Sequence, residues 1–208
     1  MTVRYFIANA QTGIIERVKT VPNSGEIPEA PSGCEVIEHE YSGPLPAYWT
    51  GAEVLPLPPQ PSPAHEWSGQ SLAWVLNPAL LPAAIAQAQA RAQAQVDDAA
   101  GRARLRYITD VPGQQATYQR KEQQAREWVD SGYAGPAPSF IAAEAAALGE
   151  TPQHIAQQVI TLADYWAYVK GPEIEAARIK WKAAVRSATT LEAVEAALNQ
   201  AIAELETL

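Results

Sequence analysis

The chain has 208 residues, a formal charge of −8 at pH 7 and 47% hydrophobic residues, so it is too apolar to be disordered and long enough for one or two cores. The acidic charge argues against nucleic acid as a partner, because binding a polyanion requires clustered Lys and Arg that neutralise phosphates. Cys34 is the only cysteine, which excludes an internal disulfide and a cysteine-rich zinc site.

Much of the apolar content is alanine, which buries little surface per residue, so we expect thin cores. Thin cores suit long packed helices or an oligomer in which neighbouring chains complete the burial. The N-terminal residues lack the pattern of a secretory leader, and no later run is apolar enough to span a bilayer. We therefore expect a soluble protein without membrane insertion.

The first part of the chain is expected to be β-rich. Twelve of the seventeen prolines lie between Pro22 and Pro82, after which the sequence becomes rich in Ala, Gln and Glu, and proline disfavours helices. Alternating apolar residues on both sides of the turn residues 9–13 predict a hairpin, and a third strand is expected at 34–37. Residues 1–54 are assigned to this β-rich N-terminal module, with Tyr41, Tyr48 and Trp49 on nearby loops.

Residues 55–82 are assigned to a Pro-rich linker that carries a Trp hairpin. The run 56–63 predicts an extended, semi-rigid spacer, and Ser68-Gly69 between Trp67 and Trp74 predicts a tight turn. A two-stranded hairpin is marginal alone, so one of its Trp residues should pack against something else. Trp49, Trp67 and Trp74 are the candidate partner contacts, because Trp suits surfaces that are half buried and half wet; ordinary packing explains them equally well.

Residues 83–149 are assigned to a long helix and a helical hairpin. The long helix, at 83–107, carries a narrow stripe at helical spacing that is made mostly of Ala and runs from Ile85 to Tyr107. Such a stripe permits close helix approach, as in a bundle or coiled coil. We therefore expect the chain to be a homo-oligomer that associates along this stripe, with a trimer as one such assembly.

Residues 150–208 are assigned to a C-terminal helical bundle. Thr151-Pro152 predicts a helix start, Gly171 is expected to end that helix, and Pro172 to open the next. Thr189 with Glu192 resembles a capping box for the last helix. The three helices are expected to form one core anchored by Trp166 and Trp181, so the predicted fold class is α+β.

Catalytic chemistry finds little support. His39, His65 and His154 lie in different predicted elements, and none is paired at a metal-ligand spacing. Cys34 with His39 could form a thiol nucleophile pair, but a cysteine in a strand is more often a small core residue. We predict no catalytic, cofactor-binding or metal residues and a protein that is not an enzyme.

One segment carries a family resemblance: Gly101-Arg-Ala-Arg-Leu-Arg-Tyr-Ile-Thr-Asp-Val-Pro-Gly-Gln-Gln-Ala-Thr-Tyr-Gln-Arg-Lys-Glu-Gln-Gln-Ala-Arg-Glu-Trp128. It resembles tail proteins of tailed bacteriophages, in which an Arg-rich helix leads through a Pro-Gly-Gln break to a Tyr, a Lys and a run of Glu and Ala. Trp181-Lys182 and the stretch 190–198 are similar to the C-terminal part of such proteins. The hairpin module, Pro-rich bridge and Trp hairpin are similar in layout to the N-terminal part.

The resemblance implies a structural, tail-fibre-associated or tail-assembly protein. We expect a non-enzymatic adaptor at the tail tip, baseplate or fibre attachment, present in the virion tail and, during assembly, in the host cytoplasm. Its partners would be other tail or fibre proteins. The alternative is a tail-fibre assembly chaperone that is absent from the mature virion. A hydrolase or thiol enzyme using Cys34 or the acidic residues, and a host-directed regulator, are further possibilities.

Overall fold

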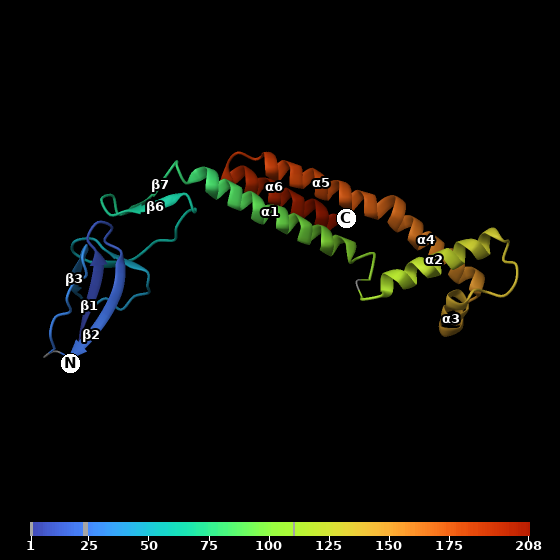
Figure 1. Ribbon diagram of the computed structural model, residues 1–208, viewed down its shortest axis with the longest axis horizontal. Helices are drawn as coiled ribbons and strands as arrows, with labels where there is room; N and C mark the ends of the chain where they lie inside the picture. The colour runs from blue at the N-terminus through green and yellow to red at the C-terminus, as the bar shows by residue number, and fades with distance from the viewer. Residues whose placement is uncertain (1, 23–24, 110) are drawn as a thin grey trace. The chain divides into compact units, whose positions relative to one another are not determined.

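The computed structural model describes residues 2–22, 25–109 and 111–208. Asp110, which falls within the segment that resembles tail proteins, lies outside these residues. The chain divides into two compact units, Met1–Ala84 and Ile85–Leu208. The strands belong to the first and nearly all the helical residues to the second (Figure 1), so the fold class is α+β as predicted.

A three-stranded antiparallel sheet forms the base of the first unit. It consists of β1 (Thr2–Asn9), β2 (Ile15–Pro22) and β3 (Cys34–Glu38) in the order β2-β1-β3, which confirms the predicted hairpin and third strand. Phe6 of β1 lies opposite Val18 and Ile37 in the two flanking strands. One face of the sheet builds a core from the following buried residues: Phe6, Ala8, Ile15, Ile37, Ala47 and Val54.

Two short hairpins complete this unit. They consist of β4 (Ala47–Trp49) with β5 (Val54–Pro56), and β6 (His65–Ser68) with β7 (Ala73–Leu76). The expectation that Tyr48 and Trp49 lie on loops is wrong, because both belong to β4. The Trp hairpin is confirmed as β6 and β7.

The Pro-rich run is not seen as a spacer. Its first residue, Pro56, ends β5, and the Leu57 N–H donates to the Pro46 carbonyl at 2.9 Å. Further along, the Pro58 carbonyl accepts from the Trp74 indole at 2.8 Å. The chain divides into compact units between Ala84 and Ile85.

Six α-helices and one π-helical turn are seen in the described chain. They are α1 (Leu81–Arg104), α2 (Gln114–Asp130), α3 (Ser139–Leu148), α4 (Pro152–Tyr165), η1 (Trp166–Lys170), α5 (Gly171–Ser187) and α6 (Leu191–Thr207). Thr151 caps α4 by accepting from the His154 N–H at 3.3 Å, as predicted. The cap of α6 is Thr190, one residue later than the predicted Thr189.

The helix that contains Gly171 does not end there. α4, η1 and α5 form one continuous helix, drawn in orange in Figure 1. The Gly171 N–H donates to the Trp166 carbonyl five residues earlier, which is the π-helical pattern. Because Pro172 has no N–H and its ring crowds the preceding turn, widening that turn allows the helix to continue where a break was predicted.

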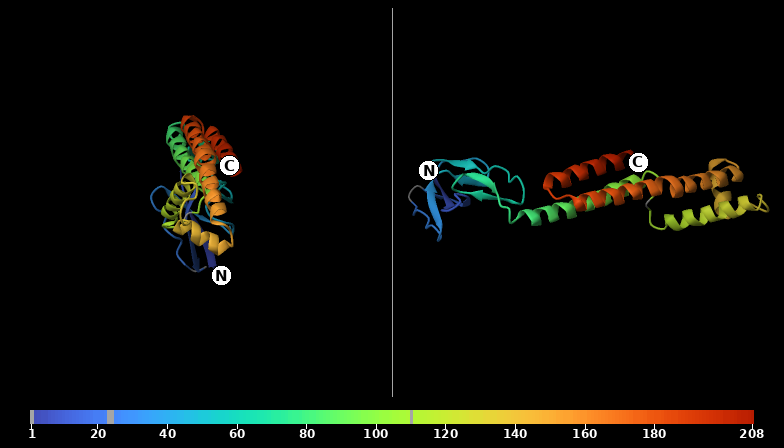
Figure 2. Two further views of the ribbon diagram at one scale, coloured as in Figure 1. Left: turned by 90° about the vertical axis from the view of Figure 1, so that its right-hand side faces the viewer. Right: turned by 90° about the horizontal axis from the view of Figure 1, so that it is seen from above.

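The helical unit holds two main cores, divided differently from the prediction. α4 packs with α2 and α3, and Ile141, Ile155 and Trp128 are buried among them. α5 packs instead with α1 and α6, and Trp166 and Trp181 lie against that second core. Figures 1 and 2 show α1 and α6 beside α5, and α2 and α3 beside α4. The prediction that the last three helices alone form one bundle is therefore wrong.

The alanine stripe of α1 is used within the chain. Its buried members face α5 and α6, with Ile174 and Leu205 opposite: they are Ala92, Val96, Ala99, Ala100 and Ala103. Ion pairs border this contact, since Asp97 binds Arg178 at 2.8 Å and also Lys182, and Arg104 binds Glu175 at 2.6 Å. The predicted seam for self-association is thus covered by the protein's own helices.

Candidate functional site

The aromatic hairpin of β6 and β7 is the best-defined candidate site. Trp67 and Trp74 lie directly opposite each other in the register, with ring centroids 5.6 Å apart at 76°. Trp67 also contacts Tyr48 of β4, with centroids 4.7 Å apart. The tilted Tyr48–Trp67 pair, at 58°, joins the two small hairpins, and the edge-to-face Trp67–Trp74 pair lies within the second one.

Hydrogen bonds fix the hairpin on the rest of the first unit. The Trp67 indole donates to the Thr12 carbonyl in the β1–β2 turn at 2.8 Å. Gly69, at the tip of the hairpin, approaches the same turn so closely that a Cβ there would lie 2.1 Å from the Gln11 carbonyl oxygen. The packing partner that a marginal two-stranded hairpin requires is therefore the β1–β2 turn.

The three candidate contact residues differ in how much surface they retain. Trp67 is only 9% exposed, so most of its ring is used inside the unit. Trp49 and Trp74 are half-buried: Trp49 lies against the sheet core with its ring 6.1 Å from that of His39, and Trp74 is bound to Pro58. Partner contact through these residues stays a prediction, with Trp49 and Trp74 the better placed.

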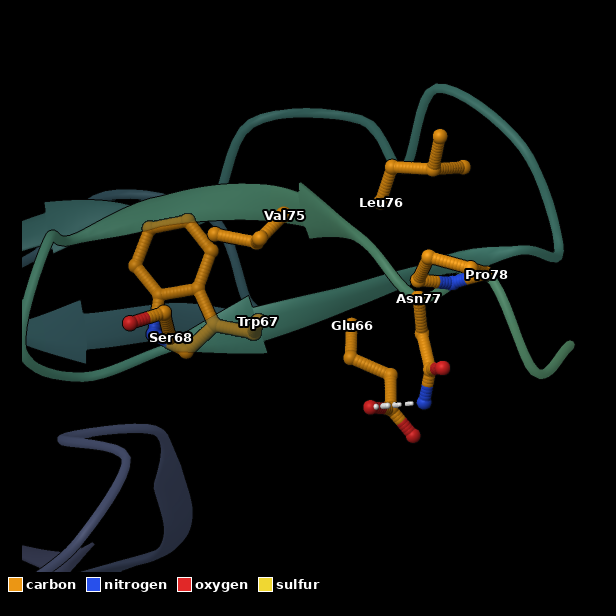
Figure 3. A pocket seen from close by; sticks show the side chains of 7 residues that line it. All are labelled: Glu66, Trp67, Ser68, Val75, Leu76, Asn77 and Pro78. Carbon is orange, nitrogen blue, oxygen red and sulfur yellow. Dashed lines mark hydrogen bonds between the residues drawn. The ribbon is translucent and has the colours of Figure 1, made fainter.

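The same hairpin has an apolar surface that sequence reasoning missed. Val75 and Leu76 of β7 are 48% and 46% exposed. They border a hollow of about 340 Å³ that is also lined by Glu66, Trp67, Ser68, Asn77 and Pro78. Figure 3 shows Glu66 and Asn77 together on one side, joined by a hydrogen bond of 2.7 Å, and Leu76 pointing away from them. The alternation of side chains along a strand shows which residues share a face, but it does not show which residues the rest of the protein leaves uncovered.

The free edge of β7 adds backbone groups to this surface. The Asn77 N–H donates to the Ala64 carbonyl at 2.7 Å, so by alternation the N–H and C=O groups of Trp74 and Leu76 point away from β6. Within residues 25–109, β7 has no second strand beside it. The opposite edge is partly covered, because His65 donates to Ser62 and accepts from the Gln60 side chain. The free edge of β7 can therefore bind an extended peptide segment, which would pair with it as an added strand.

The possible thiol pair is not brought together. Cys34 shares a face of β3 with Val36, and its thiol donates to Glu16 at 3.5 Å. His39 follows the same strand with its ring against buried Phe6, which places it on the core side. Desolvation and the hydrogen bond to Glu16 raise the pKa of the Cys34 thiol, whereas a thiolate nucleophile requires a lowered one.

Among residues 2–22, 25–109 and 111–208, no group of three or more His, Cys, Asp and Glu is placed to hold a metal ion. In the same residues, no helix combines the length and the apolar character needed to cross a bilayer. Comparison of the chain with known protein families, curated proteins and solved structures found no match.

Proposed function

We propose that this chain is a non-enzymatic structural protein of a bacteriophage tail that acts as an adaptor at the tail tip, baseplate or fibre attachment. The observation that carries the proposal is that each of the two compact units has exposed apolar side chains of its own. In the first unit they include Val75 and Leu76, which lie together on the free edge of β7. An adaptor needs a separate docking surface for each partner. The resemblance of residues 101–128 to tail proteins supports a phage tail as the assembly in which those partners occur.

The proposed contact in the first unit is strand addition to β7. An added strand would pair with the outward backbone groups of Trp74 and Leu76 and cover the Val75 side chain. Exposed apolar edge strands favour association, and proteins that avoid it usually protect such edges with charge or proline. β7 carries neither in Ala73–Leu76. Further copies of this chain, a trimer included, and other tail or fibre proteins are the proposed partners.

Quantitative mass spectrometry of gradient-purified particles from the producing strain tests the proposal. We expect the chain at a low copy number that matches the symmetry of a tail component. Its absence from particles, while it is abundant in the lysate and bound there to a tail or fibre subunit, would instead support a transient assembly chaperone. Absence from both particles and tail-protein complexes would refute both roles.

A variant pair links that test to β7. Val75→Asp should reduce the copy number in particles, because a charge on the apolar edge opposes strand addition. Ile27→Asp is the control, since Ile27 is 67% exposed in the same unit but lies outside the hairpin. Equal incorporation of the two variants into particles would show that β7 does not form the proposed contact.

A further inference from the structure

The outer face of α5 and of the η1 turn before it carries apolar side chains that the chain leaves uncovered. They are spaced by four, four, three and four positions: Tyr168 of η1, and Pro172, Ala176, Ile179 and Ala183 of α5. All five are exposed, and Tyr168 and Ile179 are 77% and 57% exposed. The opposite side of the same helix is buried against α1 and α6 through Ile174, Ala177 and Val185. One helix therefore has two apolar faces, of which the chain covers one.

The charges beside this outer face are arranged in opposite pairs. On one flank Glu173 precedes Lys180 by seven residues, and on the other Glu175 precedes Lys182 by seven residues. Seven residues are two turns of a helix that packs on a partner, so each acid and its base lie on the same flank. In a partner helix that runs in the opposite direction, the acid lies at the level where the first helix has its base.

We infer that the outer face of α5 binds the same face of a second copy of the chain, with the two helices antiparallel. In that arrangement Glu173 of one copy faces Lys180 of the other, and Glu175 faces Lys182, which gives four opposite-charge contacts around Ala176 and Ile179. A parallel pair matches only Glu175 with Lys180, twice. Charge complementarity thus favours the antiparallel arrangement of identical chains.

The internal ion pairs of these residues leave the contact open. Glu173 binds Lys170 at 2.8 Å and Lys180 binds Glu204 at 2.6 Å, and the Glu173 and Lys180 side chains are 46% and 58% exposed. On the other flank Glu175 binds Arg104 and Arg178, each at 2.6 Å, and Lys182 binds Asp97. The Glu175 and Lys182 side chains are 42% and 23% exposed, so the second copy would share these two charges with the contacts to α1. Exposed ion pairs contribute little, so they can be shared or exchanged when a second copy arrives. The contact would also cover Tyr168, an aromatic residue of the kind enriched at interfaces.

This inference concerns a surface of the second unit that is separate from β7, and it does not depend on the tail role. Sedimentation equilibrium of the purified full chain tests it, and the result stands whether or not the chain occurs in particles. We expect a reversible dimer. A chain that stays monomeric at several hundred micromolar, or one that forms a trimer, would overturn the antiparallel pair.

Charge-reversal variants test the direction of the helices. Glu173→Lys and Lys180→Glu each replace two attractive contacts with two repulsive ones, so each alone should weaken dimerisation by about tenfold or more. Their equimolar mixture should restore it, because in the mixed antiparallel dimer both contacts again join opposite charges. Glu195→Lys is the control, since it makes the same charge change at an exposed position of α6. Failure of the mixture to recover affinity, or equal weakening by Glu195→Lys, would contradict the proposal.

Discussion

Gly171 is the residue on which the wide turn of the long helix depends. A Cβ at this position would lie 2.9 Å from the Trp166 carbonyl oxygen, the acceptor of the π-helical hydrogen bond. Gly101, in the last turn of α1, has open space where its Cβ would be. Two glycines that both lie in helices are therefore retained under different constraints.

Replacing each glycine with alanine should change stability in opposite directions. Gly101→Ala should stabilise the chain by about 0.5–1 kcal/mol, because alanine loses less backbone entropy in a helix. Gly171→Ala should destabilise it by about 1 kcal/mol, because the crowding of the turn exceeds that gain. Urea unfolding followed by circular dichroism measures both changes, and stabilisation by Gly171→Ala would show that the turn tolerates a side chain.

Asp97 gives the contact between α1 and α5 a dependence on pH. Its carboxylate accepts from Lys182 and from Arg178, and these bonds hold the pKa of Asp97 below its ordinary value. A group whose pKa is lowered on folding adds stability above its unfolded pKa, and this is lost as the pH falls through the folded pKa. The stabilisation should therefore be complete at neutral pH, and it should be lost progressively as the pH falls below about 4.

Asp97→Asn should accordingly destabilise the chain at pH 7 and have much less effect at pH 3. Because the Asp97 side chain is 43% exposed, solvent screening limits the loss at pH 7 to about 1 kcal/mol or less. The neighbouring Asp98→Asn removes the same charge from an exposed position of the same helix. Thermal unfolding at the two pH values compares them, and a loss that does not depend on pH would rule out the carboxylate as its source.

At the scale of elements, α1 shows what a sequence pattern leaves open. The stripe at 85–107 was correctly expected to pack closely against helices, because small residues at helical spacing allow close approach. The same pattern fits a neighbouring copy and the chain's own α5 and α6 equally well. Only the three-dimensional arrangement, with Ile174 and Leu205 against the stripe, distinguishes the two.

Enlarging one residue of this stripe should test how closely the helices pack. Ala100 is fully buried between α1 and its neighbours, so Ala100→Leu should destabilise the chain by about 1–3 kcal/mol through overpacking. Ala90→Leu, at an exposed position of the same helix, should change stability by less than about 0.5 kcal/mol. Denaturant titration of both variants measures the difference. Similar values for both would mean that α1 packs more loosely than described.

Features that depend on neighbouring residues could be predicted from the sequence, whereas features that depend on contacts between distant residues could not. Thr151-Pro152 and the Trp hairpin were found because caps and turns depend on neighbouring residues. β4 was missed because three residues are too few for a pattern of alternation. Gly171 was misinterpreted, since glycine before proline usually ends a helix. At the candidate site the tryptophans were found, but the exposure of Val75 depends on residues distant in sequence.

At the scale of the whole molecule, the two units have separate cores. The sheet core around Phe6 belongs to Met1–Ala84, and those around Ile141 and Ile174 belong to Ile85–Leu208. Mutations in separate cores affect stability independently when they share no partners. A mutation that destabilises one unit should therefore leave the backbone amides of the other unit as well protected against hydrogen exchange as before.

Hydrogen exchange of the full chain tests this independence. Trp67→Ala, which removes a largely buried ring and the bond to Thr12, should cost about 3 kcal/mol and accelerate exchange only in the first unit. Ala100→Leu should accelerate it only in the second. Faster exchange in both units from either variant would show that they unfold together.

The wide turn at Trp166–Lys170 also sets the direction in which the two helical cores face. An α-helix turns by about 100° per residue, so the one additional residue in the turn rotates everything before it by about that angle relative to everything after it. α4 and α5 share one axis yet direct their apolar residues toward different sides of it. Deleting one residue from the turn should therefore rotate α4, together with α2 and α3, by about 100° around that axis relative to α5, so this turn determines the torsion between the two helical cores.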